Sequence, residues 1–225
     1  MSKFLPAIRE KSFFVKAIIP ITGLLLVISA YLSNTVVWLG WEFLLSFVLL
    51  LSLGLEVFSL KREPILNSGA ILLATVYTGG LFSHLVMLRQ QSDGLIFVLL
   101  VIFVIWASDT AAYFAGCAYG RRKLLPHVSP NKTWEGALAG FLAGIVMGLL
   151  VSFLVDYALI LGTIIAVTAA ISGQIGDLAA SAIKRASKVK DTGGILPGHG
   201  GIIDRFDSML FAAFIVYYVS RIIGA

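Results

Sequence analysis

The chain has 225 residues, of which 59% are hydrophobic and only 13% are charged. Soluble domains usually carry about 25% charged residues, so this composition excludes an ordinary soluble domain and predicts that a bilayer surrounds most of the chain. The single cysteine, Cys117, excludes an intramolecular disulfide framework.

Seven apolar segments are long enough to cross a membrane, which takes about 20 residues in a helix. They are residues 17–33, 36–60, 65–88, 94–118, 133–155, 158–183 and 207–224. No small-residue cleavage pattern follows the first segment, so we expect a retained span rather than a signal peptide. The predicted fold is all-α: a polytopic membrane bundle of about seven transmembrane helices, forming a single domain over residues 1–225.

The basic residues are distributed unevenly between the two sides of this predicted bundle. All but Arg89 and Arg221 of the 17 Lys and Arg residues fall before the first span or in the second, fourth and sixth connections. The positive-inside rule makes that side, with the N-terminus, cytoplasmic. The net charge of +5 is therefore a topology signal and requires no nucleic-acid partner. We expect the basic run 121–123 to anchor the chain at anionic lipid headgroups.

Span 5 carries four glycines spaced by four residues, which form a stripe along one helix face and let another backbone approach closely. Tight packing within one chain is the first interpretation, and a homodimer seam is the alternative. The stripe consists of Gly136, Gly140, Gly144 and Gly148.

Several ionisable residues are expected at membrane depth, where an aspartate costs about 2.5–3.5 kcal/mol. Asp109 and Asp177 are flanked by small residues. They are either polar contacts between helices or parts of a site in the cytoplasmic half of the membrane. For Glu42 and Glu56, structural pairing or a helix-end position is as plausible as function. His84 is expected to be a packing residue.

The connection before span 5 reads GRRKLLPHVSPNKTWEG (residues 120–136). Ser129-Pro130 is expected to start a turn, and Asn131 or Thr133 to cap the following helix. The free N–H groups of a helix N-terminus attract anions, and Lys132 adds a positive charge there. This connection is therefore a candidate phosphate-binding element.

The connection before span 7 reads SAIKRASKVKDTGGILPGHGGIIDRFDS (residues 181–208). Its glycines permit positive φ and close approach of a ligand, and such loops cradle phosphates, although no Walker A pattern is present. Asp204 and Asp207 share one helix face; a capping arrangement is the alternative. Together with Asp177, they form a carboxylate set that favours a hard cation such as Mg²⁺, and Mg²⁺ favours a phosphate-bearing substrate.

The chain resembles the CTP:phosphatidate cytidylyltransferases (CDP-diacylglycerol synthases) at these residues. The segments 129–136 and 174–177 also resemble that family, and the likeness is best over about residues 105–210. The signature residues are Ser181, Lys184, Arg185, Lys190, Asp191, Pro197, His199, Gly200, Gly201, Asp204, Arg205 and Asp207.

The resemblance implies a Mg²⁺-dependent reaction of CTP with phosphatidate, a membrane lipid, to give CDP-diacylglycerol and pyrophosphate at the cytoplasmic membrane. A second cation is an open alternative, with Asp109 as an additional or indirect ligand. The implied catalytic residues are Asp204, Asp207, Lys190 and His199. The implied substrate-binding residues are Ser129, Asn131, Lys132, Lys184, Arg185, Gly200 and Gly201. The implied metal ligands are Asp177, Asp204 and Asp207.

Three other functions are compatible with parts of the sequence. A CTP-dependent kinase of a lipid alcohol would release CDP instead of pyrophosphate. An ion-coupled transporter would use Asp109 and Asp177 as coupling carboxylates but would leave the paired aspartates beside the glycine-rich loop unexplained. A purely structural membrane protein would leave that loop unused.

Overall fold

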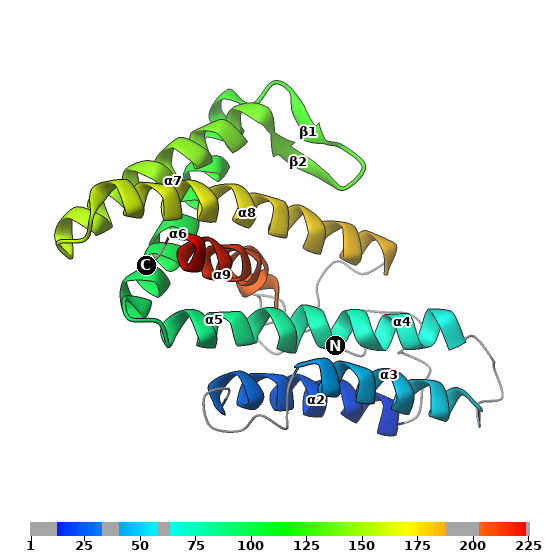
Figure 1. The fold of residues 1–225 in the computed structure, drawn as a ribbon. Coiled ribbons are helices and arrows are strands. Elements are labelled where there is room, and N and C mark those ends of the chain that lie inside the picture. Colours follow the sequence, from blue (N-terminus) through cyan, green and yellow to red (C-terminus); the bar gives the residue numbers. More distant parts are fainter. Residues whose placement is uncertain (1–12, 33–40, 58–63, 188–202, 224–225) are drawn as a thin grey trace. The chain divides into compact units, whose positions relative to one another are not determined.

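The computed structural model describes residues 13–32, 41–57, 64–187 and 203–223 (Figure 1). The chain divides into two compact units, one formed by residues 1–86 with 187–204 and the other by residues 87–186 with 205–225. Helices make up almost all of the described residues, which confirms the all-α prediction. The single domain over 1–225 stays a prediction.

The first unit contains α2 (Phe13–Leu32), α3 (Trp41–Val57) and a continuous helical run. This run comprises α4 (Pro64–Thr75), the π-helical turn η2 (Val76–Gly80) and the start of α5 (Leu81–Arg89). Apolar side chains of α2, α3 and α4 meet in one buried cluster. The cluster consists of Ile19, Val48, Ala70, Ile71 and Ala74.

The polar residues of the first unit serve packing. Glu56 is buried and its Oε2 accepts a hydrogen bond from Asn67 Nδ2 at 3.0 Å, so the structural-pairing interpretation is confirmed. Glu42 lies exposed in the first turn of α3, where the helix dipole favours a carboxylate. His84 is buried, with Nδ1 2.8 Å from the Gly80 carbonyl oxygen and its ring edge-on to Trp41, which confirms its packing role.

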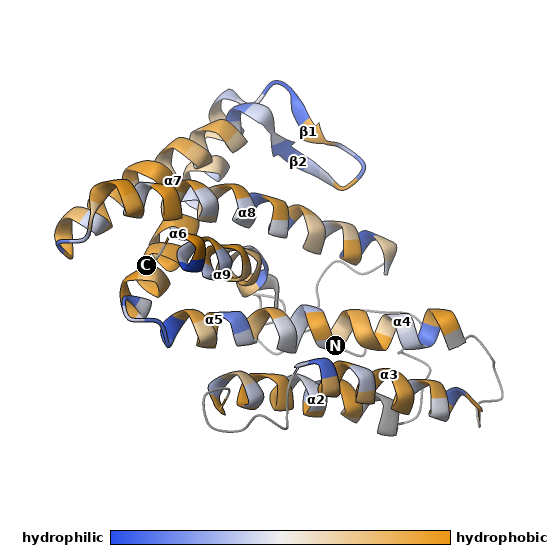
Figure 2. Cartoon of the chain, in the orientation of Figure 1, coloured by the Kyte–Doolittle hydropathy of each residue, from blue (hydrophilic) through white to orange (hydrophobic). Residues whose placement is uncertain are grey.

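The second unit contains α6 (Gly94–Tyr119), α7 (Trp134–Leu154), α8 (Leu159–Ala186) and α9 (Ile203–Ile222) from Arg205 onward. α7 packs against both α6 and α8. A two-stranded antiparallel hairpin, β1 (Lys123–Leu125) and β2 (Ser129–Thr133), joins α6 to α7. The sequence analysis did not predict this hairpin. Figure 2 shows that hydrophobic residues dominate the helices, whereas the hairpin is largely hydrophilic.

The glycine stripe of α7 is buried within the chain. A Cβ at Gly140 would lie 2.7 Å from the Ser108 carbonyl oxygen of α6, and a Cβ at Gly144 would lie 3.2 Å from Ala170 Cβ of α8. The stripe therefore brings three backbones together, as the first interpretation expected. The alternative of a homodimer seam is wrong for this face, because the chain itself covers it. The buried glycines are Gly136, Gly140, Gly144 and Gly148.

Over the residues that the structure describes, each predicted span overlaps a helix or a continuous helical run. Among the described residues, four helical runs are long and apolar enough to cross a membrane, and a shorter apolar helix covers Ala17–Leu32. The chain is thus a multi-pass membrane protein. The four runs are Ile65–Arg89, Gly94–Tyr119, Trp134–Leu154 and Leu159–Ala186.

Enlarging Gly148 tests this packing. Its added side chain would meet Ala166, and Val104 Cγ2 lies 3.4 Å from the Cβ position, so Gly148→Leu should lower the free energy of unfolding by about 1–3 kcal/mol through overpacking. The measurement is SDS-induced unfolding in mixed micelles. Val146→Leu is the matched control because Val146 is 64% exposed on the same helix. Equal stability of the two variants would contradict the packing described here.

Candidate active site

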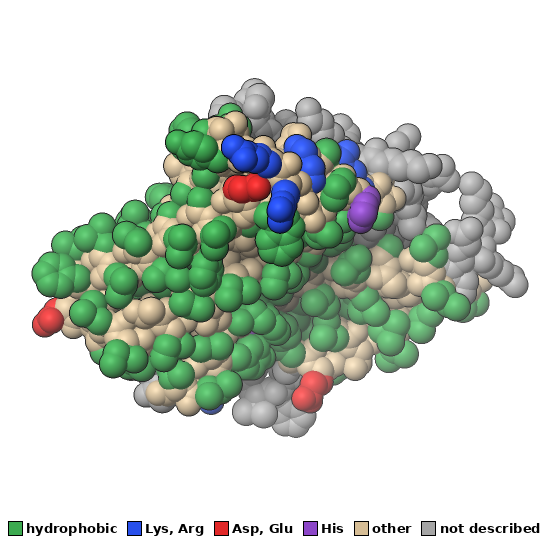
Figure 3. All heavy atoms as spheres, turned by 90° about the horizontal axis from the view of Figure 1, so that it is seen from above, with side chains coloured by type: hydrophobic (Ala, Val, Ile, Leu, Met, Phe, Trp, Pro, Cys, Tyr) green, Lys and Arg blue, Asp and Glu red, His purple; other side chains and the backbone are tan. Residues whose placement is uncertain are grey.

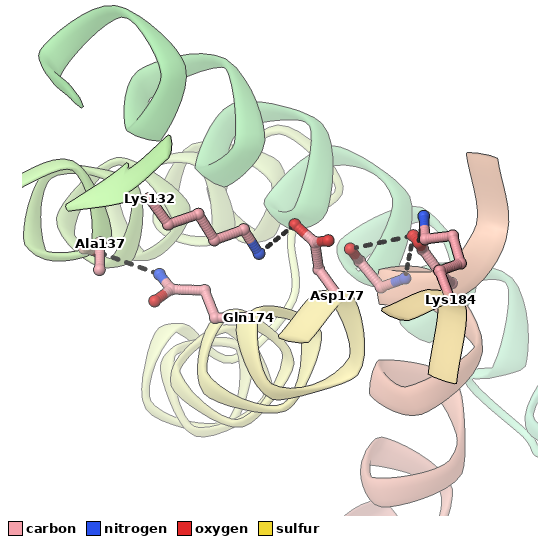
Figure 4. Close-up of polar contacts among 7 residues, drawn as sticks. Lys132, Ala137, Gln174, Asp177 and Lys184 are labelled. Carbon is pink, nitrogen blue, oxygen red and sulfur yellow. Dashed lines mark hydrogen bonds and ion pairs between the residues drawn. The ribbon is translucent and has the colours of Figure 1, made fainter. Parts of the chain in front are cut away.

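An ion pair between the hairpin and α8 lies at the centre of the candidate site. Lys132 Nζ of β2 pairs with Asp177 Oδ2 of α8 (Figure 4). The two side chains are 29% and 31% exposed, so the pair is partly shielded but open to a ligand. It joins two of the residues that the sequence predicts to act together, which are 45 positions apart in the chain.

A second pair lies between α8 and α9. Asp207 is buried, its Oδ2 lies 4.0 Å from Lys184 Nζ, and its Oδ1 accepts a hydrogen bond from the Ser208 backbone N–H at 2.8 Å. The two helices approach closely at Gly176, where a Cβ would meet Phe211 Cβ at 2.6 Å. A helix-capping role for Asp207 is wrong, because this carboxylate lies in the second turn of α9 and faces Lys184.

Asp109 of α6 joins the same electrostatic group. Its charge interacts with those of Asp177 and Lys132, and the charge of Asp207 interacts with those of Asp177, Lys184 and Asp109. We call the five residues Asp109, Lys132, Asp177, Lys184 and Asp207 the charged cluster. Three carboxylates and two ammonium groups from four elements thus interact electrostatically.

One face of α8 supplies most of the contacts that build the site. At 3.6 residues per turn, its site residues fall within about 100° of arc. Gln174 Nε2 donates to the Ala137 carbonyl oxygen of α7 at 3.0 Å, and Arg185 Nε donates to the Val128 carbonyl oxygen at 3.4 Å. These contacts hold α8 against the hairpin and the start of α7; Figure 4 shows the bond from Gln174 to Ala137. The residues on this face are Gln174, Asp177, Ser181, Lys184 and Arg185.

The hairpin fixes Lys132 by strand pairing and by the helix start that follows. Thr133 is the N-cap of α7, since its Oγ1 accepts a hydrogen bond from Gly136 N at 3.2 Å. Glu135 Oε2 accepts from the backbone N–H groups of Arg121 and Arg122 at 3.1 and 3.2 Å. Side chains alternate along a strand, so Lys132 reaches Asp177 while its neighbour Asn131 is exposed.

Two local predictions for this segment need correction. Ser129 and Pro130 lie within β2 and do not start a turn; the turn lies earlier, where Val128 N donates to the Leu125 carbonyl oxygen at 3.1 Å. A two-stranded hairpin has only edge strands, which tolerate proline. Asn131 is not the cap because the strand continues to Thr133.

The structure brings together only part of the predicted site. Lys132, Asp177, Lys184 and Asp207 gather in the charged cluster, Ser129 and Asn131 lie on β2, and Arg185 contacts the hairpin. Asp204 lies in the first turn of α9, but its side chain is outside the description. Lys190, His199, Gly200 and Gly201 lie outside the described residues altogether.

The assignment of Asp177, Asp204 and Asp207 as metal ligands therefore stays a prediction. Within the described ranges, no group of three or more His, Cys, Asp or Glu side chains is arranged to hold a metal ion, and the side chain of Asp204 is not among those ranges. Gln174 was missed as a site residue. Gln174 lies about one helical turn before Asp177 in the sequence, and this spacing could have indicated that the two side chains share a helix face.

The fold and the charged cluster define a multi-pass helical membrane protein with a site of carboxylates and lysines at one end of its helices. The cytidylyltransferase family model matches residues 3–223, and the chain belongs to that family.

Curated relatives agree with this membership. The chain is 40% identical to the phosphatidate cytidylyltransferase of Bacillus subtilis (strain 168) over 154 residues, which cover 67% of this chain and 57% of the relative. It is 41% identical to that of Staphylococcus haemolyticus (strain JCSC1435) over 169 residues, covering 74% and 63%. For Staphylococcus aureus (strain COL) the identity is 35% over 161 residues, covering 71% and 61%. The matches thus span less than two thirds of each relative.

The Lys132–Asp177 pair should appear as a coupling energy. In Lys132→Met, Asp177→Asn and the double variant, we expect a coupling of about 0.5–1 kcal/mol, because the pair is partly exposed to screening. SDS unfolding without added nucleotide or metal measures it. Strict additivity of the two single effects would show that the pair does not tie the hairpin to α8.

Removing the Gln174 amide should loosen α8 from the start of α7. Gln174→Leu loses the hydrogen bond to the Ala137 carbonyl oxygen, and membrane-embedded side-chain bonds are worth about 0.6 kcal/mol, with a maximum near 1.7. The same unfolding assay should show a loss in this range. Thr168→Val is the matched control because, among the described residues, its hydroxyl donates within α8 to the Ile164 carbonyl oxygen. An equal or larger effect of the control would contradict the role of Gln174.

Proposed function

We propose that this protein is a phosphatidate cytidylyltransferase, which transfers a cytidylyl group from CTP to phosphatidate and releases pyrophosphate. The observation that carries the proposal is the convergence of Lys132, Asp177, Lys184 and Asp207. These residues belong to three segments that resemble one family of enzymes, and the family membership agrees with the resemblance.

The chemistry of this transfer suits a site without a strong general base. A phosphate oxygen of phosphatidate attacks the α-phosphorus of CTP, a new P–O bond forms, and the bond from that phosphorus to the oxygen bridging to the β-phosphate breaks. The electron pair leaves with pyrophosphate. Because the second pKa of a phosphate monoester is about 6, the nucleophile is already ionised near neutral pH and no hydroxyl must lose a proton.

The main barrier is electrostatic, since one anion attacks another. Lys132 and Lys184 would hold substrate phosphates and reduce their repulsion, and Arg185 would add a planar donor at the cytoplasmic end of α8. Asp177 and Asp207 hold these lysines in position before substrate arrives. Lys190, His199 and the glycines of the loop 193–201 would complete the phosphate cradle; they lie outside the described residues.

The acidic residues fit a divalent cation chemically. The donors gathered on α6, α8 and α9 are carboxylate oxygens, which Mg²⁺ prefers. Asp177, Asp207 and Asp204 would hold it, with Asp109 as a ligand of a second cation or an indirect partner. Bound there, Mg²⁺ would supply positive charge for the departing pyrophosphate.

The proposed site also accounts for the membrane location. The acyl chains of phosphatidate can stay in lipid beside the apolar helices while CTP arrives from the cytoplasm. The asymmetry of Lys and Arg supports a cytoplasmic position for the hairpin end, and we propose the cytoplasmic membrane as the location.

Pyrophosphate release tests the proposal. The purified protein in detergent receives CTP, Mg²⁺ and phosphatidate, and release should require all three. Asp177→Asn should lower the rate by about 100-fold or more, because a group that balances transition-state charge is lost. Glu42→Gln is the matched control, since Glu42 is exposed at the start of α3.

The products separate this proposal from the other functions. Release of CDP with phosphorylated lipid would identify a lipid kinase instead. A folded protein that does not bind CTP would exclude both enzymes and return attention to ion-coupled transport.

A further inference from the structure

The segment where α6 leads into β1 carries a second group of cations that the proposed reaction does not use. Arg121, Arg122 and Lys123 are exposed, and their side chains form no ion pair among the described residues. Figure 3 shows Lys and Arg side chains gathered in one place on a face that is otherwise largely hydrophobic. This group is distinct from Lys132, which pairs with Asp177.

The backbone beneath these cations is held in place by one carboxylate. Glu135 accepts hydrogen bonds from the N–H groups of Arg121 and Arg122, and its charge also acts on Arg122. The single negative charge of Glu135 does not neutralise the three positive charges of residues 121–123, so this surface has a net positive charge. A fixed backbone presents the side chains outward at little further cost in conformational entropy.

Exposed aromatic residues mark where this surface lies relative to the bilayer. Tyr119 at the end of α6 is 75% exposed, and Trp134 at the start of α7 is 61% exposed. Both helices are long and apolar enough to span a membrane. Tyr and Trp concentrate at the membrane–water interface, so the residues directly beyond them lie at headgroup depth.

We propose that residues 121–123, flanked by Tyr119 and Trp134, bind the headgroups of anionic bilayer lipids, separately from the substrate site. We call this surface the headgroup patch. Basic residues beside a spanning helix attract anionic lipids within a Debye length, and arginine forks match phosphate geometry. The patch therefore keeps anionic lipid at the hairpin whose other strand carries Lys132.

Native mass spectrometry of the full-length protein tests the patch. The protein is reconstituted in nanodiscs of phosphatidylcholine and phosphatidylglycerol without phosphatidate, extracted into detergent, and examined for retained phosphatidylglycerol. Arg121→Gln/Arg122→Gln/Lys123→Gln should weaken retention on the order of tenfold or more, because three attractive charges are lost. The charge-keeping variant Arg121→Lys/Arg122→Lys/Lys123→Arg should retain the lipid at close to the wild-type level.

Three outcomes would overturn the proposal. Unchanged retention in the triple Gln variant would show that the patch binds no lipid. Loss of retention in Lys132→Met, with none in the triple Gln variant, would place the lipid in the charged cluster. The wild-type protein supplies a check that needs no variant: retention should fall as salt is raised, and salt-independent retention would also overturn the proposal. None of these readings depends on catalytic activity, so they stand apart from the test of the proposed transferase.

Discussion

The Lys132–Asp177 ion pair is the interaction on which the candidate site depends. It connects a short β-hairpin to the C-terminal half of a long membrane helix and brings two polar segments of the chain into one place. Opposite charges in a partly dehydrated setting attract more strongly than in water, yet an unpaired charge at this depth would be expensive. Each partner thus lowers the energetic cost of placing the other charge at this depth, and both side chains stay accessible to a charged ligand.

Close helix packing makes this pairing geometrically feasible. The glycines of α7 let α6 and α8 approach its backbone, and Gly176 of α8 does the same for α9. Small residues therefore act on function indirectly: they set the separation at which carboxylates from α6, α8 and α9 interact. A bundle of the same apolar content with larger residues at these positions would hold the same charges too far apart.

The segment that joins α6 to α7 carries two chemically different groups of cations. Lys132 belongs to the charged cluster, whereas the run 121–123 is exposed and flanked by interfacial aromatic residues. The capped start of α7, through Thr133 and Glu135, holds both parts of the segment in place. With the activity and the headgroup patch proposed above, this arrangement would separate contacts with the reacting groups from contacts with the surrounding bilayer.

Sequence alone determined the helical membrane fold, the positions of the helices within a few residues, and the polar segments that carry the chemistry. Apolar length and the distribution of Lys and Arg are properties of the chain itself, so they can be read without coordinates. The three family-like segments likewise needed no structure. The sequence left open whether Asp109 and Glu56 serve packing or function, and whether the glycine stripe packs within one chain or forms a homodimer seam.

Tertiary structure decided the alternatives for Glu56 and the glycine stripe, because contacts between residues far apart in sequence depend on how helices pack. It paired Glu56 with Asn67, buried the glycine stripe against α6 and α8, and brought Asp109 to Asp177. It also replaced an expected turn by a strand, since pairing of Ser129 with Leu125 outweighs the local preference of Ser-Pro for turns. Strand pairing and helix packing depend on contacts between distant parts of the chain, so no local pattern could have specified which residue forms the ion pair with Lys132.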